Sequence, residues 1–524
     1  MVMSRSLACL LFALFITNYM FSETIPDNYT NFCQVNDSMC LSDENHLYDR
    51  DSLNGDFFQL DDSLLVLICP EMCIKPVQQI NLPNVHFSYD EKIFYTPNDS
   101  SKNNFLIITT PELWDTLQYE IKTYAEDVHA IYGYGIYVDV VSTNSPEQLK
   151  SVILNHENNL CGVVLIGDFV ATMFEMNNDH NKYGYRRWPC DLYYMDLDGE
   201  WLDSDSNGIY DIHSGNVAPE VYLARLSASG LSGLGNESLL IRRQLLKSHS
   251  FWWDSSFFKQ DTVLNYINKD WVYSSPSSDI APVFSTNEVD DIKCGIDSCF
   301  SKNDYLSRLY QTQYGFTYLA AHSSPVIHHF QDGNLNVGQI MDIPSSNYAY
   351  NLFCCSALNW LSSNMYNAYL GGAYLFNGGK TLTVIGSTKT GSMLGRYHFY
   401  NQFDQKNIGA AFHYWWNHYY PAYYHSDYAV SWSYGMTILG DPTIYFRHDV
   451  HNYCVNDLVL TVFPQNNHSN YILYKAGRSI TVTNKYVIPL GVHIVFDAPS
   501  IVFEGEFECP KGATFETRNE GCKL

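Results

Sequence analysis

Two residues whose types could do chemistry together stand at the ends of two short apolar runs. His322 follows Phe316–Ala321, and Cys355 follows Tyr350–Cys354. Each run is apolar, bounded by turn-forming residues and too short for a helix, so each predicts a buried strand. In an open α/β sheet, ligands lie beyond the carboxyl ends of the strands, so the two residues would share one crevice if their strands are parallel neighbours. There an imidazole can activate a thiolate nucleophile and later protonate a leaving amine.

Residue types alone leave this assignment open. The competing interpretation is a buried structural cysteine and an unrelated surface histidine, because Cys and His motifs do not transfer between families. Cys354 is an alternative nucleophile. Since adjacent residues of a strand face opposite ways, only one of the two thiols, Cys354 or Cys355, can point toward His322.

The elements that must position these residues alternate between strands and helices from Phe105 to about Thr443. Helices begin at Pro111 and at Ser145-Pro146, where a proline in the first turn or a capping serine favours a helix start. Strands alternating with helices predict right-handed crossovers and a mostly parallel sheet flanked by helices, which is an α/β fold. The expected strands are 105–109, 136–141, 162–166, 220–225, 263–267, 316–321, 350–354 and 381–385.

The regions on either side of this unit have a different character. Residues 23–104 are rich in Asn, Asp and Cys, and we interpret them as a small disulfide-stapled β module or a pro-region. Residues 450–524 lose helical periodicity and predict a small C-terminal all-β domain with strands at 480–483, 492–496 and 500–503. At 524 residues the chain is long enough for these several domains.

The N-terminus predicts export. Residues 1–22 combine the positive charge of Arg5 with an apolar core over Leu7–Ile16, as in a signal peptide, and the core is too short for a comfortable membrane span. No later stretch approaches 18 uninterrupted apolar residues, so we expect a secreted or lumenal protein without a stable membrane span.

Cysteine content and charge agree with that compartment. Fourteen cysteines fit an oxidising environment, and the net charge of −26 argues against a nucleic-acid partner while suiting calcium binding. Short spacings suggest disulfides, and N-x-S/T patterns suggest surface glycosylation. The candidate pairs are Cys33/Cys40, Cys69/Cys73, Cys294/Cys299 and Cys509/Cys522, and the sequons are at Asn28, Asn36, Asn98, Asn236 and Asn467.

Residues 105–446 resemble the gingipain family of secreted cysteine peptidases, whose fold is caspase-like. The matching motifs occur in the family's order: Leu165–Asp168 after the third strand, the Asp-rich segment Asp191–Trp201, Leu223–Arg225 in place of a Gly-Arg strand, His322 with Cys355 33 residues later, and Gly440–Thr443. The resemblance implies a secreted cysteine endopeptidase that acts on proteins or peptides and needs no cofactor for catalysis. It also selects Cys355 rather than Cys354 as the nucleophile.

The resemblance further implies roles for residues around the pair. Asp270 matches the acid that orients the imidazole, although loop carboxylates are also common without a function. The amides of Ser323 and Cys355 would hold the oxyanion. The specificity pocket would be built from loops beyond the catalytic strands. Its candidate residues are Asp279, whose carboxylate suits a basic side chain, and Gly386, Ser387 and Thr388 as a wall.

Some positions depart from the family pattern. Ala321 and Ser323 replace the glycines that flank the histidine, and Leu358 and Trp360 replace a Gly and a Phe after the cysteine. Glycine is favoured where a backbone needs unusual angles or close approach. These changes keep open a second hypothesis, a catalytically inactive gingipain-like binding or adhesion protein.

A separate signal points to a metal. Asp203, Asp205, Asn207 and Asp211 place oxygen ligands at alternate positions, with Gly208 at the sixth. This is the first half of a calcium loop, where glycine permits the sharp turn. Ser214 stands where an EF-hand has its Glu, so we expect a structural Ca²⁺ loop of another kind, against the alternative of an Asp/Ser turn without metal.

Overall fold

The computed structural model describes residues 103–253, 262–272, 289–293 and 299–445, except 313, 344, 363, 365, 404 and 420–425, and then 457–460, 471–519 and 521. Before residue 103 it describes only short strands, at residues 32–35, 38–41, 57–61, 64–67 and 88–95, and residues 96–97. The chain divides into two compact units, Met1–Ile80 and Asn81–Leu524. In the first unit, β1 (Phe32–Val35) pairs antiparallel with β2 (Ser38–Leu41), and β3 (Phe57–Asp61) with β4 (Leu64–Leu67). Within the described residues, no helix is both long and apolar enough to cross a membrane.

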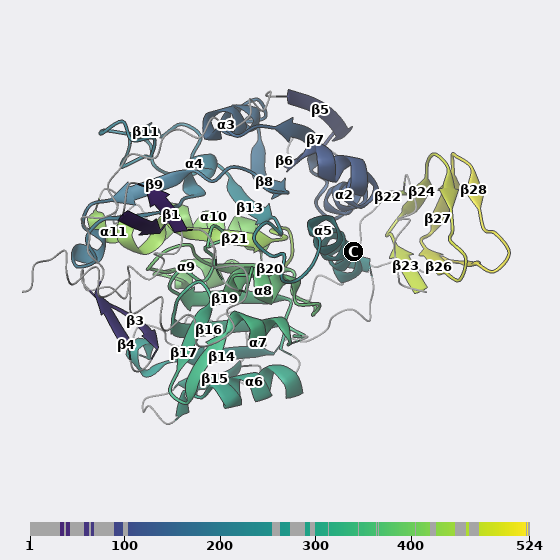
Figure 1. Ribbon diagram of the computed structural model, residues 1–524. Helices are drawn as coiled ribbons and strands as arrows, with labels where there is room; N and C mark the ends of the chain where they lie inside the picture. The colour runs from purple at the N-terminus through teal and green to yellow at the C-terminus, as the bar shows by residue number, and fades with distance from the viewer. Residues whose placement is uncertain are drawn as a thin grey trace, which may run out of the picture. The chain divides into compact units, whose positions relative to one another are not determined.

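A large central sheet organises the second unit (Figure 1). Its strands run in the order β15-β14-β16-β19-β20-β21-β13-β8-β6-β7-β5. Neighbours pair in parallel, except that β20–β21 and β5–β7 are antiparallel. The bounds are β5 Ser88–Tyr95, β6 Asn104–Thr109, β7 Gly135–Ser142, β8 Leu160–Ile166, β13 Tyr222–Leu226, β14 Val263–Ile267, β15 Val289–Lys293, β16 Phe316–Ser323, β19 Ala349–Cys354, β20 Thr383–Ser387 and β21 Met436–Gly440. The predicted α/β fold with a mostly parallel sheet is confirmed.

Helices cover both faces of this sheet, because the inner strands are apolar on both sides. One apolar cluster gathers residues of α3, α4, α9, α10 and α11, and a second gathers residues of α2, α5, α6, α7 and α8. The bounds are α2 Pro111–Tyr132, α3 Pro146–Leu154, α4 Leu192–Met195, α5 Glu237–Trp253, α6 Lys302–Gln311, α7 Val337–Met341, α8 Leu370–Phe376, α9 Tyr397–Tyr400, α10 Ile408–Tyr419 and α11 Asp427–Ser433. The predicted helix starts at Pro111 and Ser145 are confirmed: Ser145 accepts from the Gln148 N–H, and Thr110, which the sequence analysis did not single out, accepts from the Leu113 N–H.

A hairpin extends the sheet beyond the end of β16. β17 (Ile327–Phe330) pairs antiparallel with the last residues of β16 and with β18 (Gly333–Asn336). The same end of the sheet carries η4 (Lys269–Trp271), a short 3-10 helix that directly follows β14. Small pairs of strands and η3 (Asp179–Asn181) lie in the connections: β9 (Met173–Met176) with β10 (Arg186–Pro189), and β11 (Glu200–Leu202) with β12 (Ile212–Ser214).

The C-terminal domain is a stack of parallel strand turns. Asp457 pairs with Ser479 and Tyr471 with His493, an offset of 22 residues, whereas Ser479 pairs with Ser500 and His493 with Thr514, an offset of 21. The predicted all-β character of this segment is thus confirmed, and its strands form three parallel ladders. Its division from the preceding residues as a separate domain stays a prediction, since Asn81–Leu524 form one compact unit. The strand bounds are β22 Asp457–Leu460, β23 Tyr471–Lys475, β24 Ser479–Val482, β25 Tyr486–Val487, β26 His493–Asp497, β27 Ser500–Phe503, β28 Phe507–Glu508 and β29 Thr514–Arg518.

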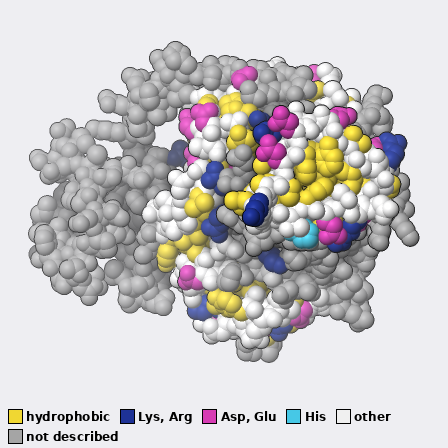
Figure 2. Space-filling model, turned by 90° about the vertical axis from the view of Figure 1, so that its right-hand side faces the viewer, with side chains coloured by type: hydrophobic (Ala, Val, Ile, Leu, Met, Phe, Trp, Pro, Cys, Tyr) yellow, Lys and Arg dark blue, Asp and Glu magenta, His cyan; other side chains and the backbone are white. Residues whose placement is uncertain are grey.

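Apolar side chains fill the inside of this stack and continue to its last turn. The rings of Phe503, Phe507 and Phe515 lie within 4.6–6.0 Å of one another. Phe503 is nevertheless 41% exposed, and Leu490 and Val502 are also exposed. Hydrophobic side chains gather in a broad patch on the face drawn in Figure 2.

Candidate active site

His322 lies one residue before the end of β16. The strand begins as the apolar run 316–321, and its pairing with β17 carries it on to Ser323. His322 is opposite His329, and Ser323 is opposite His328. The sheet therefore fixes the backbone on both sides of the imidazole, while the side chain of His322 is 48% exposed.

Asp270 comes from the neighbouring strand end. The side chain of Asn268, the residue that begins η4, accepts the Asp270 N–H at 3.0 Å and so turns the chain directly after β14. This turn brings Asp270 Oδ2 to 2.9 Å from His322 Nε2. This contact uses Nε2 of His322, so Nδ1 is the ring nitrogen that is left to serve another group. The Trp271 ring lies 5.2 Å from the imidazole. The Asp270 side chain is 50% exposed, so this pair lies in contact with water.

Cys355 follows β19 at the same level as His322. The register pairs Ala321 with Cys354, so the next residues on the two strands are His322 and Cys355. Adjacent parallel strands run about 4.8 Å apart. Asp270, His322 and Cys355 therefore follow three strands that are neighbours in the sheet, β14, β16 and β19, in the order acid, imidazole and thiol.

The two adjacent thiols differ in their surroundings. Cys354 is buried on the sheet face that α2 and α8 cover, and its Sγ donates to the Leu319 carbonyl at 3.6 Å. Burial raises the pKa of Cys354 to about 12, which keeps it protonated and unreactive. Cys355 is half-buried and is not in a disulfide. Strand alternation gives it the face of Phe353 and Ala320, which is also the face of His322.

The chain turns sharply directly after Cys355. Ser356 adopts φ 56°, a left-handed conformation that is uncommon for a residue with a side chain. Its N–H donates to the Lys389 carbonyl at 2.8 Å, and Leu358 N–H donates to the Ser387 carbonyl at 3.0 Å. Lys389 is itself held by a buried ion pair with Asp179 at 2.8 Å. The end of β20 thus fixes the turn that carries the thiol.

The predicted pocket wall is part of the interior. Ser387 and Thr388 are buried, and the Thr388 hydroxyl donates to the Pro189 carbonyl at 2.7 Å. A Cβ at Gly386 would come within 2.7 Å of Leu358, so this glycine makes room for the leucine that departs from the family pattern. These three residues do not form an open wall because packing uses their surfaces. Asp279 lies outside the described residues.

A strip of three aromatic rings, Trp271, Phe353 and Trp432, begins beside His322 instead. Trp271 lies 5.4 Å from Phe353, and Phe353 lies 6.2 Å from Trp432 of α11. Trp271 and Trp432 are only partly buried. Sequence reasoning did not find this strip, because Trp432 is 77 positions from Cys355 and only the packing of α11 brings it near Phe353.

Two of the matched motifs serve the interior of the fold. Arg225 is buried and binds Asp191 with its Nε at 2.9 Å, while Trp360 covers the guanidinium at 4.7 Å from the ring centre. Asp441 is buried, accepts from the Tyr124 hydroxyl at 2.9 Å, and has a pKa raised by burial. These contacts tie α2, α4, β13 and β21 together, so the motifs support the sheet rather than touch Cys355.

The predicted calcium loop binds its own backbone. Asp203 accepts from the N–H groups of Asn207 and Gly208, and Asp211 accepts from the N–H of Ser204. Asn207 donates from its side-chain amide to Asp205 at 3.1 Å. The hydrogen bonds from the backbone lower the pKa of Asp203. The loop is exposed, and its oxygens make turn contacts of the kind that Asp and Asn form without a metal.

Another acidic group offers a tighter arrangement. Among the described residues, Asp196, Asp198 and Glu220 each place a carboxylate oxygen within 4.8 Å of the others. Burial, reinforced by the charges of Asp196 and Asp198, raises the pKa of Glu220 to about 7. Carboxylate oxygens are the ligands that Ca²⁺ prefers, so these residues are chemically suited to hold it. The sequence signal was the acidic run before Trp201, but Glu220 joins it only through the fold.

No family model matches the chain, and no curated protein matches it. Solved structures match it in part. The crystal structure of the Arg-specific cysteine proteinase gingipain R (RgpB) has 14% identity and a TM-score of 0.48 over 67% of this chain and 80% of that one. A structure described as a protease has 15% identity and a TM-score of 0.46 over 66% and 79%. The complex of the Porphyromonas gingivalis RgpB pro- and mature domains has 13% identity and a TM-score of 0.46 over 66% and 80%.

Proposed function

We propose that this protein is a cysteine-type endopeptidase that hydrolyses peptide bonds through Cys355 and His322. One observation carries the proposal: an acid, an imidazole and a thiol follow three neighbouring strands, with Asp270 bonded to His322 at 2.9 Å. The carboxyl ends of parallel strands form the crevice where α/β proteins bind ligands. Proteins or peptides are the substrates that this chemistry serves, and the N-terminal export signal, outside the described residues, stays a prediction of secretion.

The residues divide the reaction between them. The Cys355 thiol gives its proton to His322, and the thiolate attacks the scissile carbonyl carbon to form a C–S bond. His322 then protonates the leaving amine as the C–N bond breaks, and water hydrolyses the thioester with His322 as the base. Asp270 orients the imidazole by accepting from Nε2–H, so that Nδ1 serves the thiol.

The backbone of β16 supports the assignment of an oxyanion donor. Ser324 N–H donates to the Ile327 carbonyl at 2.9 Å, which makes 324/327 a hydrogen-bonded pair of the antiparallel ladder. Bonded and non-bonded pairs alternate along such a ladder, so 323/328 is a non-bonded pair and the Ser323 N–H points away from β17. It points toward β19 and Cys355. The amides of Ser323 and Cys355 would then stabilise the oxyanion together.

The second candidate is an inactive binding protein on the same scaffold. The observation in its favour is that Ala321 and Ser323 stand in place of the glycines that flank the histidine in the family. In the structure, Ala321 is buried and the Ser323 hydroxyl bonds to His328, so neither side chain lies on the face of His322 and Cys355. The two hypotheses differ in one measurable property, turnover that depends on Cys355.

Hydrolysis of a mixed peptide library tests the proposal, with products identified by mass spectrometry. We expect new peptide termini with the wild-type protein, none above background with Cys355→Ala, and full activity with Cys354→Ala. The adjacent variant is a matched control because it removes a thiol one residue away on the opposite face. Equal cleavage by wild type and Cys355→Ala would overturn the proposal, and so would a loss of cleavage with Cys354→Ala alone when both variants fold.

A further inference from the structure

Ser323, the residue after the candidate catalytic histidine, has a side-chain partner that the sequence did not reveal. Its Oγ lies 2.6 Å from Nδ1 of His328, the residue opposite it on β17. His328 is fully buried, and its ring lies 5.8 Å from that of Tyr374 in α8. A hydrogen bond between a half-buried hydroxyl and a buried imidazole is therefore built into the strand that carries His322.

Strand alternation separates this bond from the reacting groups. Side chains of adjacent residues in β16 leave the sheet on opposite faces, so Ser323 shares the face of Ala321 and Cys354, and His322 shares the face of Ala320. A serine in place of glycine therefore adds no atoms on the side where a substrate would approach Cys355. Its hydroxyl lies on the far face of the sheet.

The same alternation directs the backbone of Ser323. Ala320 accepts from Asn268 N–H at 3.0 Å, so the even-numbered groups of β16 point toward β14, and β17 lies on that side. The Ser323 N–H consequently points to the opposite side, where β19 ends at Cys355. This N–H receives no support from the β17 ladder. What holds residue 323 against β17 at this position is the side-chain bond to His328.

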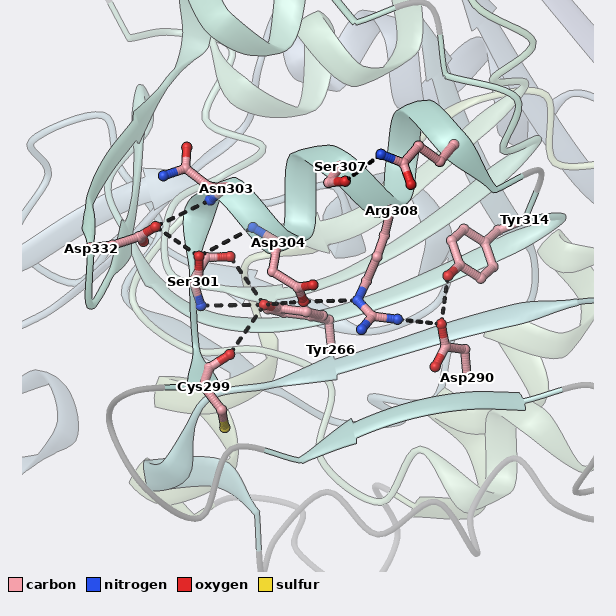
Figure 3. Close-up of polar contacts among 11 residues, drawn as sticks. Tyr266, Asp290, Cys299, Ser301, Asn303, Asp304, Ser307, Arg308, Tyr314 and Asp332 are labelled. Carbon is pink, nitrogen blue, oxygen red and sulfur yellow. Dashed lines mark hydrogen bonds and ion pairs between the residues drawn. The ribbon is translucent and has the colours of Figure 1, made fainter.

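The far end of the hairpin is anchored separately (Figure 3). Asp332 accepts from the backbone N–H groups of Lys302 and Asn303 and from the Ser301 hydroxyl, at 2.5, 3.2 and 2.7 Å. These bonds outweigh the effect of burial and hold the pKa of Asp332 below its usual value. Asp332 therefore caps the first turn of α6 and fixes the turn between β17 and β18.

We propose that the Ser323–His328 hydrogen bond aims the Ser323 amide at the oxyanion formed during peptide hydrolysis, so that both side chains are positioning residues. The inference rests on the proposed peptidase function. A glycine can take this position through its backbone freedom, whereas this chain uses a side-chain tether to a buried imidazole. His328 Nε2 is buried without a hydrogen-bond partner among the described residues, which destabilises the fold. An apolar side chain would fill the same space without this penalty, so packing alone does not explain a histidine here.

The test compares two reactions of the same thiol. Peptide hydrolysis passes through an oxyanion, but alkylation of Cys355 by iodoacetamide forms a C–S bond with loss of iodide and forms no oxyanion. Ser323→Ala and His328→Phe each remove the bond. We expect each to lower kcat about 10- to 100-fold with KM within about twofold, because loss of an oxyanion donor costs about 100- to 1,000-fold and misalignment somewhat less. The alkylation rate should stay unchanged.

Two further variants sharpen the result. The double variant Ser323→Ala/His328→Phe should be no slower than the slower single variant, because all three lack the same bond. Asp332→Asn weakens the other end of the hairpin and should lower Tm while leaving kcat within about twofold. Circular dichroism and Tm establish that each variant folds.

Each outcome has one meaning. Unchanged kcat in folded Ser323→Ala and His328→Phe overturns the positioning role while the peptidase stands. Equal losses of hydrolysis and alkylation also overturn it, because they place the effect on the Cys355–His322 pair. Multiplying losses in the double variant contradict a shared bond. If the wild-type protein alkylates at Cys355 but cleaves no peptide, the proposed function itself fails, and this role falls with it.

Discussion

Replacement of Asp270 tests how much the acid contributes to the proposed catalysis. Asp270 Oδ2 lies 2.9 Å from His322 Nε2, but both side chains are about half exposed. An ion pair in contact with water contributes about 0.2–1 kcal/mol, because solvent screens its charges. A tenfold change in rate corresponds to about 1.4 kcal/mol. We therefore expect Asp270→Asn, which retains a hydrogen-bond acceptor but loses the charge, to lower kcat/KM only about fivefold.

Asp270→Ala removes the hydrogen bond as well. A typical hydrogen bond adds about 0.5–1.5 kcal/mol, so the total loss is about 2.5 kcal/mol at most, or roughly 60-fold in kcat/KM. A buried triad aspartate is worth about 10,000-fold, far above this range. Salt screens the electrostatic contribution of Asp270. The ratio of kcat/KM between wild type and Asp270→Asn should therefore move toward one in about 1 M NaCl.

Initial rates on a peptide found in the library screen measure these effects at low and high salt. Lys269→Ala, next to Asp270 in η4, is the matched control and should stay close to wild type. A loss above about 1,000-fold in Asp270→Asn would refute the reasoning, because it would require an acid shielded from water. Unchanged rates in both Asp270 variants would show that this carboxylate does not orient His322.

Three other predictions follow from buried or clustered charges. Lys389→Met leaves the buried carboxylate of Asp179 without its ion-pair partner and should lower the free energy of unfolding by about 3–5 kcal/mol. Tm should fall in this variant and recover in Lys389→Met/Asp179→Leu, and an unchanged Tm in Lys389→Met would contradict the prediction. Burial lowers the pKa of His328 to about 3, so its neutral state supports the fold above pH 6.5, and this support, about 5 kcal/mol in full, is lost as pH falls toward 3. The Tm of His328→Phe should fall less than that of wild type between pH 7 and 4, and parallel curves would exclude the effect. Ca²⁺ should raise Tm in a way that Glu220→Gln abolishes and Asp203→Asn preserves, whereas the reverse would place the ion in the exposed loop.

The sequence predicted most of the central sheet, because its inner strands are continuous apolar runs. The expected strand at 263–267 coincides with β14, and that at 350–354 differs from β19 by one residue. The extension of β16 to Ser323 and the hairpin β17–β18 escaped prediction. Residues 327–336 are mostly polar, and their few apolar side chains do not alternate regularly with polar ones in the sequence. They form strands because the end of β16 offers a backbone edge.

The candidate site could be predicted from the sequence only in part, for a similar reason. His322 and Cys355 are visible as polar residues after apolar runs, since the end of a strand can be located from local pattern. The partner of Ser323 depends on the register between β16 and β17, and the tether of the Cys355 turn depends on where β20 ends. The predicted wall at Ser387 and Thr388 lies inside the fold, because burial there is decided by Leu358 and Pro189, which are distant in sequence.

Activation of the Cys355 thiol by His322 underlies the proposed function. It is tested most directly by labelling the native protein with iodoacetamide at mildly acidic and neutral pH and locating the adduct by mass spectrometry. We predict rapid labelling of Cys355, at least tenfold slower labelling in His322→Ala, and no labelling of buried Cys354 in either protein. Labelling of Cys355 at the rate of an ordinary thiol, or at the same rate in His322→Ala, would contradict the account.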